Sequence, residues 1–146
     1  MSMLTKKYNE TEMLTMLSKL LLESDEYIET AVYCMFKGTG FFGSGDSFCG
    51  YAAITSKNRF IGYQMAMLNT APILLSMDNL VKVKISSALL GQKSVYLEFK
   101  SDETYKIKVQ FASKVYGAKF PNQERNVEIM LEIFREKQNM LNLGMM

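Results

Sequence analysis

The chain has 146 residues, a length that predicts a single domain with its own hydrophobic core. Hydrophobic residues make up 48% of the chain and charged residues 22%, a composition typical of globular proteins that excludes a disordered chain. The formal net charge of +2 argues against a dedicated nucleic-acid-binding protein, because such proteins are usually far more basic. Histidine is absent, which excludes histidine-based acid–base catalysis and most catalytic zinc sites.

The apolar segments of the chain do not match a signal peptide or a membrane span. Residues 1–12 contain no continuous apolar run of the kind that signal peptides have. The longest apolar stretch, residues 65–77, is interrupted by polar residues and a proline, whereas a spanning helix needs about 20 apolar residues. We therefore expect a cytoplasmic protein in which Cys34 and Cys49 are free thiols, with a disulfide between them as the alternative.

The first predicted element is an amphipathic helix over residues 9–23. Asn9, with Glu12 three residues later, has the pattern of a capping box, and Ser24 and Asp25 end the helix. Its apolar side chains recur every three or four residues, which places them on one face. They are Met13, Met16, Leu17, Leu20 and Leu21. Either the chain's own domain or a second copy must cover this face, so these residues are the candidate self-association surface.

Short antiparallel strands follow the helix. The earlier ones are rich in β-branched and aromatic residues, and the later ones alternate lysine with apolar residues, as in a sheet with one wet face. The predicted strands cover residues 27–37, 48–55, 60–65, 80–86, 94–100 and 104–111, with no regular pattern between the third and the fourth. A second amphipathic helix is predicted over residues 122–139, with Val127, Met130, Leu131 and Phe134 on its apolar face.

Three segments and the last helix, in a fixed order, carry a resemblance to a known family. Residues 53–61 (AITSKNRFI) are similar to a hairpin of that family, and residues 76–83 resemble the stretch that opens its second sheet. Residues 91–109 are similar to its glycine turn and strand pair, and the last helix stands where the family has a capping helix. The chain thus resembles the bacterial pleckstrin-homology-like (PH-like) domains over residues 26–138, with residues 1–25 as an added N-terminal helix.

The PH-like resemblance implies an α+β, mainly β fold. It would be a partly open barrel of two roughly orthogonal antiparallel sheets over residues 26–146, capped by the C-terminal helix. Related domains bind lipid head groups, peptides or other proteins, so the resemblance implies binding rather than catalysis. We expect a non-enzymatic adaptor that mediates protein–protein contact or self-association. Peripheral binding to anionic lipid is the alternative, and a small-molecule-binding β-barrel enzyme is the third hypothesis.

The glycine-rich loop of residues 38–47 is the first candidate interaction site. Its glycines match the dinucleotide-binding spacing, but that motif requires a following helix and here a strand follows. No nucleotide site is therefore expected. The loop carries Phe41 and Phe42, which either anchor a partner or a membrane surface or fold back over the end of the barrel.

The outer face of the later strands is the second candidate interaction site. Strand alternation places four lysines and one tyrosine on this face. They are Lys82, Lys84, Tyr96, Lys106 and Lys108. Such a face can bind anionic lipid or nucleic acid, or it can serve solubility with Glu98 paired to the lysines, and it is one of the surfaces through which an adaptor would act. Nucleic acid is not expected there, since the face has one aromatic residue and no arginine.

No cofactor and no metal are expected. The acidic residues near the first helix lack the tight alternating spacing of magnesium or calcium loops, and they suit helix caps and solvated turns. The 12 methionines stand mostly on apolar stripes or at the termini, so we expect them to fill the core rather than to bind a soft metal.

Overall fold

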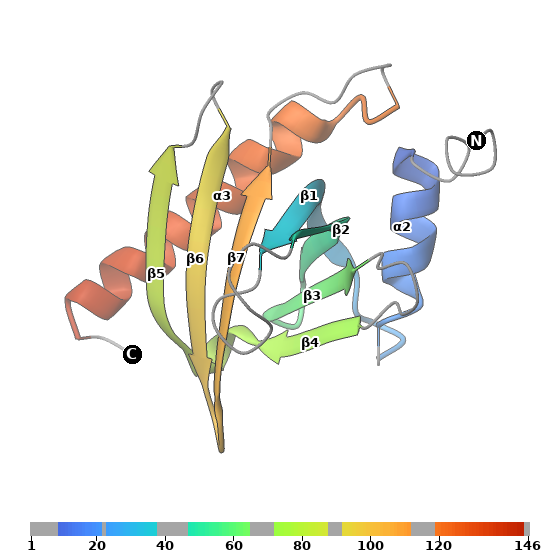
Figure 1. The fold of residues 1–146 in the computed structure, drawn as a ribbon. Helices are drawn as coiled ribbons and strands as arrows, with labels where there is room; N and C mark the ends of the chain where they lie inside the picture. The colour runs from blue at the N-terminus through green and yellow to red at the C-terminus, as the bar shows by residue number, and fades with distance from the viewer. Residues whose placement is uncertain are drawn as a thin grey trace.

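The computed structural model of the chain describes residues 9–21, 23–37, 47–64, 72–87, 92–111 and 119–144. Within these residues the fold is mainly β, with a seven-stranded antiparallel sheet, one helix before it and one after it (Figure 1). The elements are α2 (Glu10–Ser18), β1 (Ile28–Lys37), β2 (Ser47–Thr55), β3 (Arg59–Gln64), β4 (Pro72–Ser76), the 3₁₀ helix η1 (Met77–Asn79), β5 (Leu80–Ser87), β6 (Lys93–Lys100), β7 (Thr104–Phe111) and α3 (Gln123–Asn142).

The strands form one open sheet in the order β4-β3-β2-β1-β7-β6-β5. β1 pairs with β2 along most of its length, and only its last residues, Met35 to Lys37, also pair with β7. We call β1–β4 the first half of the sheet and β5–β7 the second half. Figure 1 shows the two halves running in crossed directions. The resemblance implied two orthogonal sheets; the structure has one open sheet that turns where β1 meets β7.

The main core lies between α3 and the inner face of both halves. α3 buries the residues that its sequence pattern predicts, which are Val127, Met130, Leu131 and Phe134. The ring of Phe60 from the first half lies 6.1 Å from Phe99 of the second half and 6.2 Å from Phe134, measured between centroids. One aromatic cluster thus joins α3 to both halves, and each such side chain contributes about 1.5–3 kcal/mol by burial.

The start of α3 is attached to the part of β1 that does not pair with β7. The side-chain amide of Gln123 donates to the Tyr33 carbonyl oxygen at 2.9 Å and accepts from the Tyr33 N–H at 3.0 Å. The Thr30 hydroxyl donates to the Asn126 carbonyl oxygen at 2.8 Å. The helix therefore supplies hydrogen-bond partners that the neighbouring strand no longer provides.

A second, smaller core lies on the opposite face of the first half, under α2. Asn9 caps this helix as predicted, since its side chain accepts from the Glu12 N–H at 2.8 Å, but the helix ends at Ser18 rather than Glu23. Met13 and Leu17 are buried there. The other members of this core are Ala31, Tyr51, Ala53, Ile61 and Phe120, with Met16, Leu20 and Leu21 partly buried against them.

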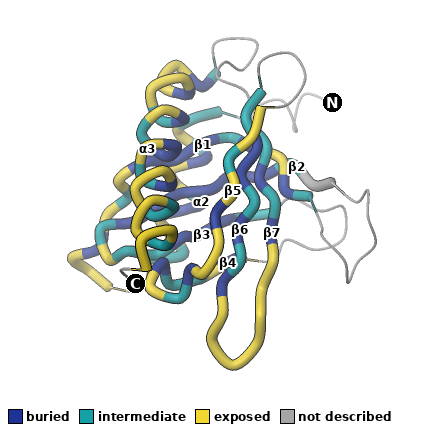
Figure 2. Tube along the Cα trace, turned by 90° about the vertical axis from the view of Figure 1, so that its left-hand side faces the viewer, coloured by how far each residue is buried: buried dark blue, intermediate teal, exposed yellow. Residues whose placement is uncertain are grey.

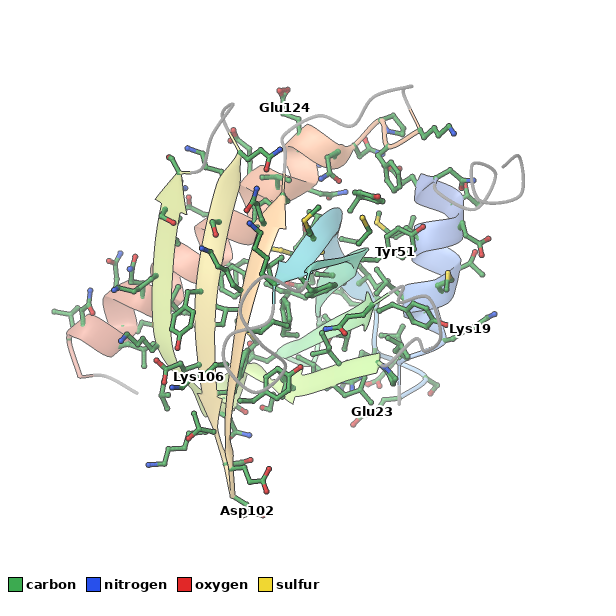
Figure 3. All side chains as sticks on the ribbon, viewed as in Figure 1. Lys19, Glu23, Tyr51, Asp102, Lys106 and Glu124 are labelled. Atoms are coloured by element: carbon green, nitrogen blue, oxygen red, sulfur yellow. The ribbon has the colours of Figure 1, made fainter. Side chains whose placement is uncertain are left out.

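The predicted stripe of α2 is therefore not an open self-association surface. Its five apolar residues are Met13, Met16, Leu17, Leu20 and Leu21, and all of them pack against the chain's own second core. Figure 3 shows Tyr51 of β2 beside α2, on the face of the sheet away from α3. The chain itself provides the cover that the stripe requires.

Three details of the strands differ from the predictions. β4 was not predicted; it is an edge strand that begins at Pro72 and leaves Leu74 exposed, so it has no apolar alternation. Val81 was expected to point inward, but a register shift after Leu80 buries Leu80 and exposes Val81. Tyr105 was also expected inside; it is 41% exposed near the tip of the β6–β7 hairpin, which projects beyond the rest of the sheet (Figure 2).

Among the described residues, neither helix has the length and apolar character needed to cross a bilayer. The predicted site residues Phe41 and Phe42 lie outside the described residues, so their exposure stays a prediction.

Candidate binding surface

The outer face of the second half is the polar face of the sheet. The inner residues of β5, β6 and β7 belong to the main core, so the alternate residues point to the opposite side. Of the two helices, α2 packs on the first half and α3 on the inner face, and neither covers this side. We call this surface the lysine face. Its residues are Lys82, Lys84, Ser86, Ser94, Tyr96, Glu98, Lys106, Lys108 and Gln110.

The strand register arranges these residues in three rows across the sheet. The first row is Lys82–Glu98–Lys106, the second is Lys84–Tyr96–Lys108, and the third is Ser86–Ser94–Gln110. All five residues predicted for this face therefore come together on it. They do so because three consecutive strands keep a strict two-residue alternation in matched register.

The first row is partly balanced in charge. The Lys82 ammonium lies 3.8 Å from the Glu98 carboxylate, with the two side chains 51% and 19% exposed. Lys106, on the neighbouring strand β7, stands directly opposite the same Glu98. An exposed pair of this kind contributes about 0–1 kcal/mol to stability. Glu98 thus places one negative charge between two lysines.

The second row carries positive charge with no acidic partner. No ion pair joins Lys84 or Lys108 to an acidic side chain within the described parts of the chain. Tyr96 stands between them, and its pKa is raised by partial burial and then by the neighbouring Glu98 carboxylate. The phenol therefore stays protonated at neutral pH, and its hydroxyl donates to the Glu98 carboxylate.

The third row contains a buried hydroxyl. Ser94 is 3% exposed, and its Oγ has no hydrogen-bond partner among the described residues. Its neighbour Gln110 instead donates its side-chain amide to the Gln92 side-chain oxygen. Beside this row a hollow of about 680 Å³ opens in the face. Its lining includes Lys82, Lys84, Ser86, Ser94, Tyr96 and Lys108.

No protein-family model, curated protein or solved structure is significantly similar to this chain. The resemblance to PH-like domains stays a prediction, and the function has to be inferred from the chemistry of the lysine face.

Ser94 is the residue of this surface that sequence reasoning missed. Alternation places it on the lysine face at the start of the predicted strand 94–100, so its orientation could be derived. Its burial could not, because burial is not determined by the local sequence pattern. A serine on a wet face carries no sequence signal of an unpartnered hydroxyl.

A second polar cluster lies in the first half, and its polar groups are hydrogen-bonded within the protein. The Arg59 guanidinium donates from Nε and one Nη to both carboxylate oxygens of Glu26, at 2.8 and 2.7 Å. The Thr55 hydroxyl donates to the same carboxylate at 2.6 Å, and Arg59 also donates to the Leu20 carbonyl oxygen at 3.2 Å. The Glu26 side chain is 1% exposed. This cluster ties the segment after α2 to the β2–β3 hairpin, and its groups satisfy one another.

Neither cysteine forms a disulfide. Cys34 is buried and Cys49 is half-buried, and both are free. Burial raises the pKa of the Cys34 thiol, which makes it a weak nucleophile. Among the described residues no group of three or more Asp, Glu or Cys side chains is arranged to hold a metal ion.

Proposed function

We propose that the protein is a non-enzymatic binding module that docks an acidic protein partner on the lysine face. One observation carries the proposal: Lys84 and Lys108 flank Tyr96 in a single row, and no described acidic side chain neutralises them. Complementary charge speeds encounter and aligns two protein surfaces. An aromatic residue at the centre adds apolar contact area.

Glu98 favours a protein partner over an anionic membrane. It lies between Lys82 and Lys106, so its carboxylate would stand in the middle of any contact with the face. A protein can present a donor to that carboxylate at a fixed position, whereas mobile lipid head groups cannot. Binding to anionic lipid is therefore an outcome of the test below rather than the proposal.

A second copy of this chain is the alternative protein partner, because α3 carries acidic residues on its outer side. Four glutamates recur every four residues along the helix and all are exposed. They are Glu124, Glu128, Glu132 and Glu136. Figure 3 shows Glu124 at the start of α3, pointing away from the sheet. This row and the lysine face lie on opposite sides of the molecule, so copies would associate head to tail.

The test uses poly-L-glutamate as the acidic probe and measures its binding by fluorescence anisotropy. Replacing Lys84 and Lys108 by Ala should weaken binding about tenfold or more, since about 1.4 kcal/mol corresponds to a factor of ten. The matched control replaces Lys19 and Lys137 by Ala, which removes the same charge elsewhere and should leave binding close to wild type. Equal losses in both variants would contradict the location of the site.

Two further measurements separate the alternatives. Vesicles with phosphatidylserine should not bind the full chain; salt-sensitive binding to vesicles without binding to poly-L-glutamate would replace the proposal by the lipid alternative. Light scattering over a range of concentrations tests association of copies, and the reversals Glu128→Lys and Glu132→Lys should abolish any association that depends on α3. Binding to neither probe, with no association of copies, would overturn the proposed function.

A further inference from the structure

The Ser94 hydroxyl is the unusual group in the lysine face. Buried hydroxyl groups nearly always have a hydrogen-bond partner, because an unpartnered one lowers stability. Within the part of the chain that the structure describes, Ser94 Oγ has none, although the residue is only 3% exposed. Its two cross-strand neighbours are Ser86 and Gln110, and the Gln110 amide is used by Gln92. An acceptor supplied by a ligand in the adjoining hollow would satisfy the hydroxyl.

Two lysines stand in the row next to this hydroxyl, one on each side of β6. Lys84 and Lys108 are both in register with Tyr96, so their backbones lie about 10 Å apart across β6, at about 4.8 Å for each strand spacing. Ser94 is two residues from Tyr96 along β6, a distance of about 6.8 Å. The long, flexible lysine stems let both ammonium groups reach a ligand held over β6 beside Ser94.

Three other polar side chains around the hollow already have partners, and one of them is Tyr96, which hydrogen-bonds to Glu98. Lys82 lies against Glu98 at 3.8 Å. Gln138 of α3 donates its side-chain amide to the Val83 carbonyl oxygen at 3.0 Å, at the edge of β5. The donors that remain around the hollow are two ammonium groups and the hydroxyls of Ser86 and Ser94, and of these hydroxyls only that of Ser94 is buried.

We infer that this hollow is a site for a phosphoryl group, held between Lys84 and Lys108 with the Ser94 hydroxyl as its third donor. A phosphate monoester has three terminal oxygens for three donors, and as a dianion it balances two ammonium groups. A carboxylate offers two oxygens and one charge, so it would leave one donor and one positive charge unmatched. The hollow of about 680 Å³ has room for the group and the residue that carries it.

The inference rests on the proposed function, because it names the chemical group by which the acidic partner is anchored. The phosphoryl group is carried by a side chain of that partner. A free phosphorylated molecule presents the same chemistry, so the experiment needs one probe for each source. It also needs a probe for acidic charge alone, which keeps the two proposals distinguishable.

The experiment titrates the full-length chain with inorganic phosphate and follows amide ¹⁵N–¹H chemical shifts. Acetate at matched ionic strength is the monoanion control. Phosphate should give saturable shifts around residues 84–86, 94–96 and 108–110. The affinity for acetate, from the same titration, should be at least tenfold weaker than the affinity for phosphate. Ser94→Ala should weaken phosphate binding about tenfold without unfolding the protein, since it removes an unpartnered group. Ser94→Thr keeps the hydroxyl and should retain binding.

The source of the phosphoryl group is tested with two peptides and one phosphorylated amino acid. A glutamate-rich peptide with one phosphoserine should bind more tightly than the same peptide with serine, and more tightly than free O-phosphoserine. Equal affinity for the phosphopeptide and for O-phosphoserine would overturn the protein source in favour of a small phosphorylated molecule.

Three outcomes would overturn the phosphoryl site itself. If phosphate gives no saturable shifts while poly-L-glutamate still binds, the site is wrong and the proposed function stands. If Ser94→Ala binds phosphate like wild type while replacement of both lysines abolishes binding, the lysines act by charge alone and the three-donor site is wrong. If neither probe binds, both proposals fail together.

Discussion

The two halves of the sheet differ in what covers them. In the first half both faces are buried: along β2, Tyr51 and Ala53 pack under α2, whereas Ala52 and Ile54 face the main core. In the second half only the inner face is buried, and the outer one is the lysine face. A strand with two dry faces needs apolar or small residues at every position, whereas a strand with one wet face can alternate. The second half is therefore where the chain is free to carry binding chemistry.

The largest expected effect is at the aromatic cluster that both halves share. Phe134→Ala removes a ring that is 1% exposed and lies 6.2 Å from Phe60. We expect a loss of about 3–5 kcal/mol in the free energy of unfolding, from lost burial and the remaining cavity. Chemical denaturation measures it, with Leu74→Ala on the exposed edge strand as the control, within about 0.5 kcal/mol of wild type. A loss no larger than that of the control would show that the halves do not share one core.

The next effect belongs to the first half alone. Glu26→Gln leaves the Arg59 charge without its carboxylate in a cluster where Glu26 is 1% and Arg59 15% exposed. Breaking a buried pair costs about 3–5 kcal/mol, and the exposed part of Arg59 places this case at the lower end. Replacing both residues, Glu26→Gln with Arg59→Met, should cost less than the sum of the single changes. Additive losses in this double-mutant cycle would contradict a coupled pair.

Leu17→Ala tests whether the two halves are stabilised separately. Leu17 of α2 is fully buried against the sheet, so its truncation should lower stability by about 2–3 kcal/mol. Hydrogen exchange should show faster exchange in β1–β3, which α2 covers, and little change in β5–β7. Light scattering should give the same mass as wild type, because the stripe packs within the chain. A lower mass than wild type would instead support association through α2.

The predictable part of the molecule is the part that follows from local pattern. Strand alternation is enough to place Lys84 and Lys108 on one face, and helical spacing is enough to bury Val127 and Phe134. Features set by contacts between distant segments could not be derived. Nothing near Glu26 in the sequence indicates that Arg59, on β3, will form an ion pair with its buried carboxylate.

Two further misses have the same kind of cause. Val81 continues an apolar alternation, and only the pairing of β5 with β6 places the register shift that turns it outward. Ser94 is on the expected face, but strand alternation alone does not show that it is buried. The site residues that determine charge were therefore predictable, and the hydroxyl that suggests a specific ligand was not.

On the lysine face, in contrast, large effects on binding should come with small effects on stability. Replacing Lys84 and Lys108 by Ala should change the free energy of unfolding by no more than about 0.5 kcal/mol, since both lysines lack an acidic partner among the described residues. Denaturation of this double variant beside wild type measures the difference. A clear loss of stability would indicate that the lysines serve the fold, which would weaken the binding proposal.

The smallest expected effect belongs to the exposed ion pair of Lys57 and Asp25, which lies beside the buried pair of Arg59 and Glu26. Lys57 lies 3.0 Å from Asp25, and a hydrogen bond and charge attraction from Lys57 lower the pKa of Asp25 below its ordinary 3.8. The unfolded chain then binds this proton more readily than the folded one. The stabilisation is therefore present above pH 3.8 and is lost as the pH falls through the lowered pKa.

Asp25→Asn measures this contribution. The melting temperature of the variant should be slightly below that of wild type at neutral pH, and the difference should vanish in acid and shrink in high salt, because the pair is open to solvent. Glu26→Gln should keep its deficit in high salt, since water and ions do not reach that carboxylate. If salt removed both deficits equally, the buried cluster would be no better shielded than the exposed pair, and the first half would not be as dry as its packing indicates.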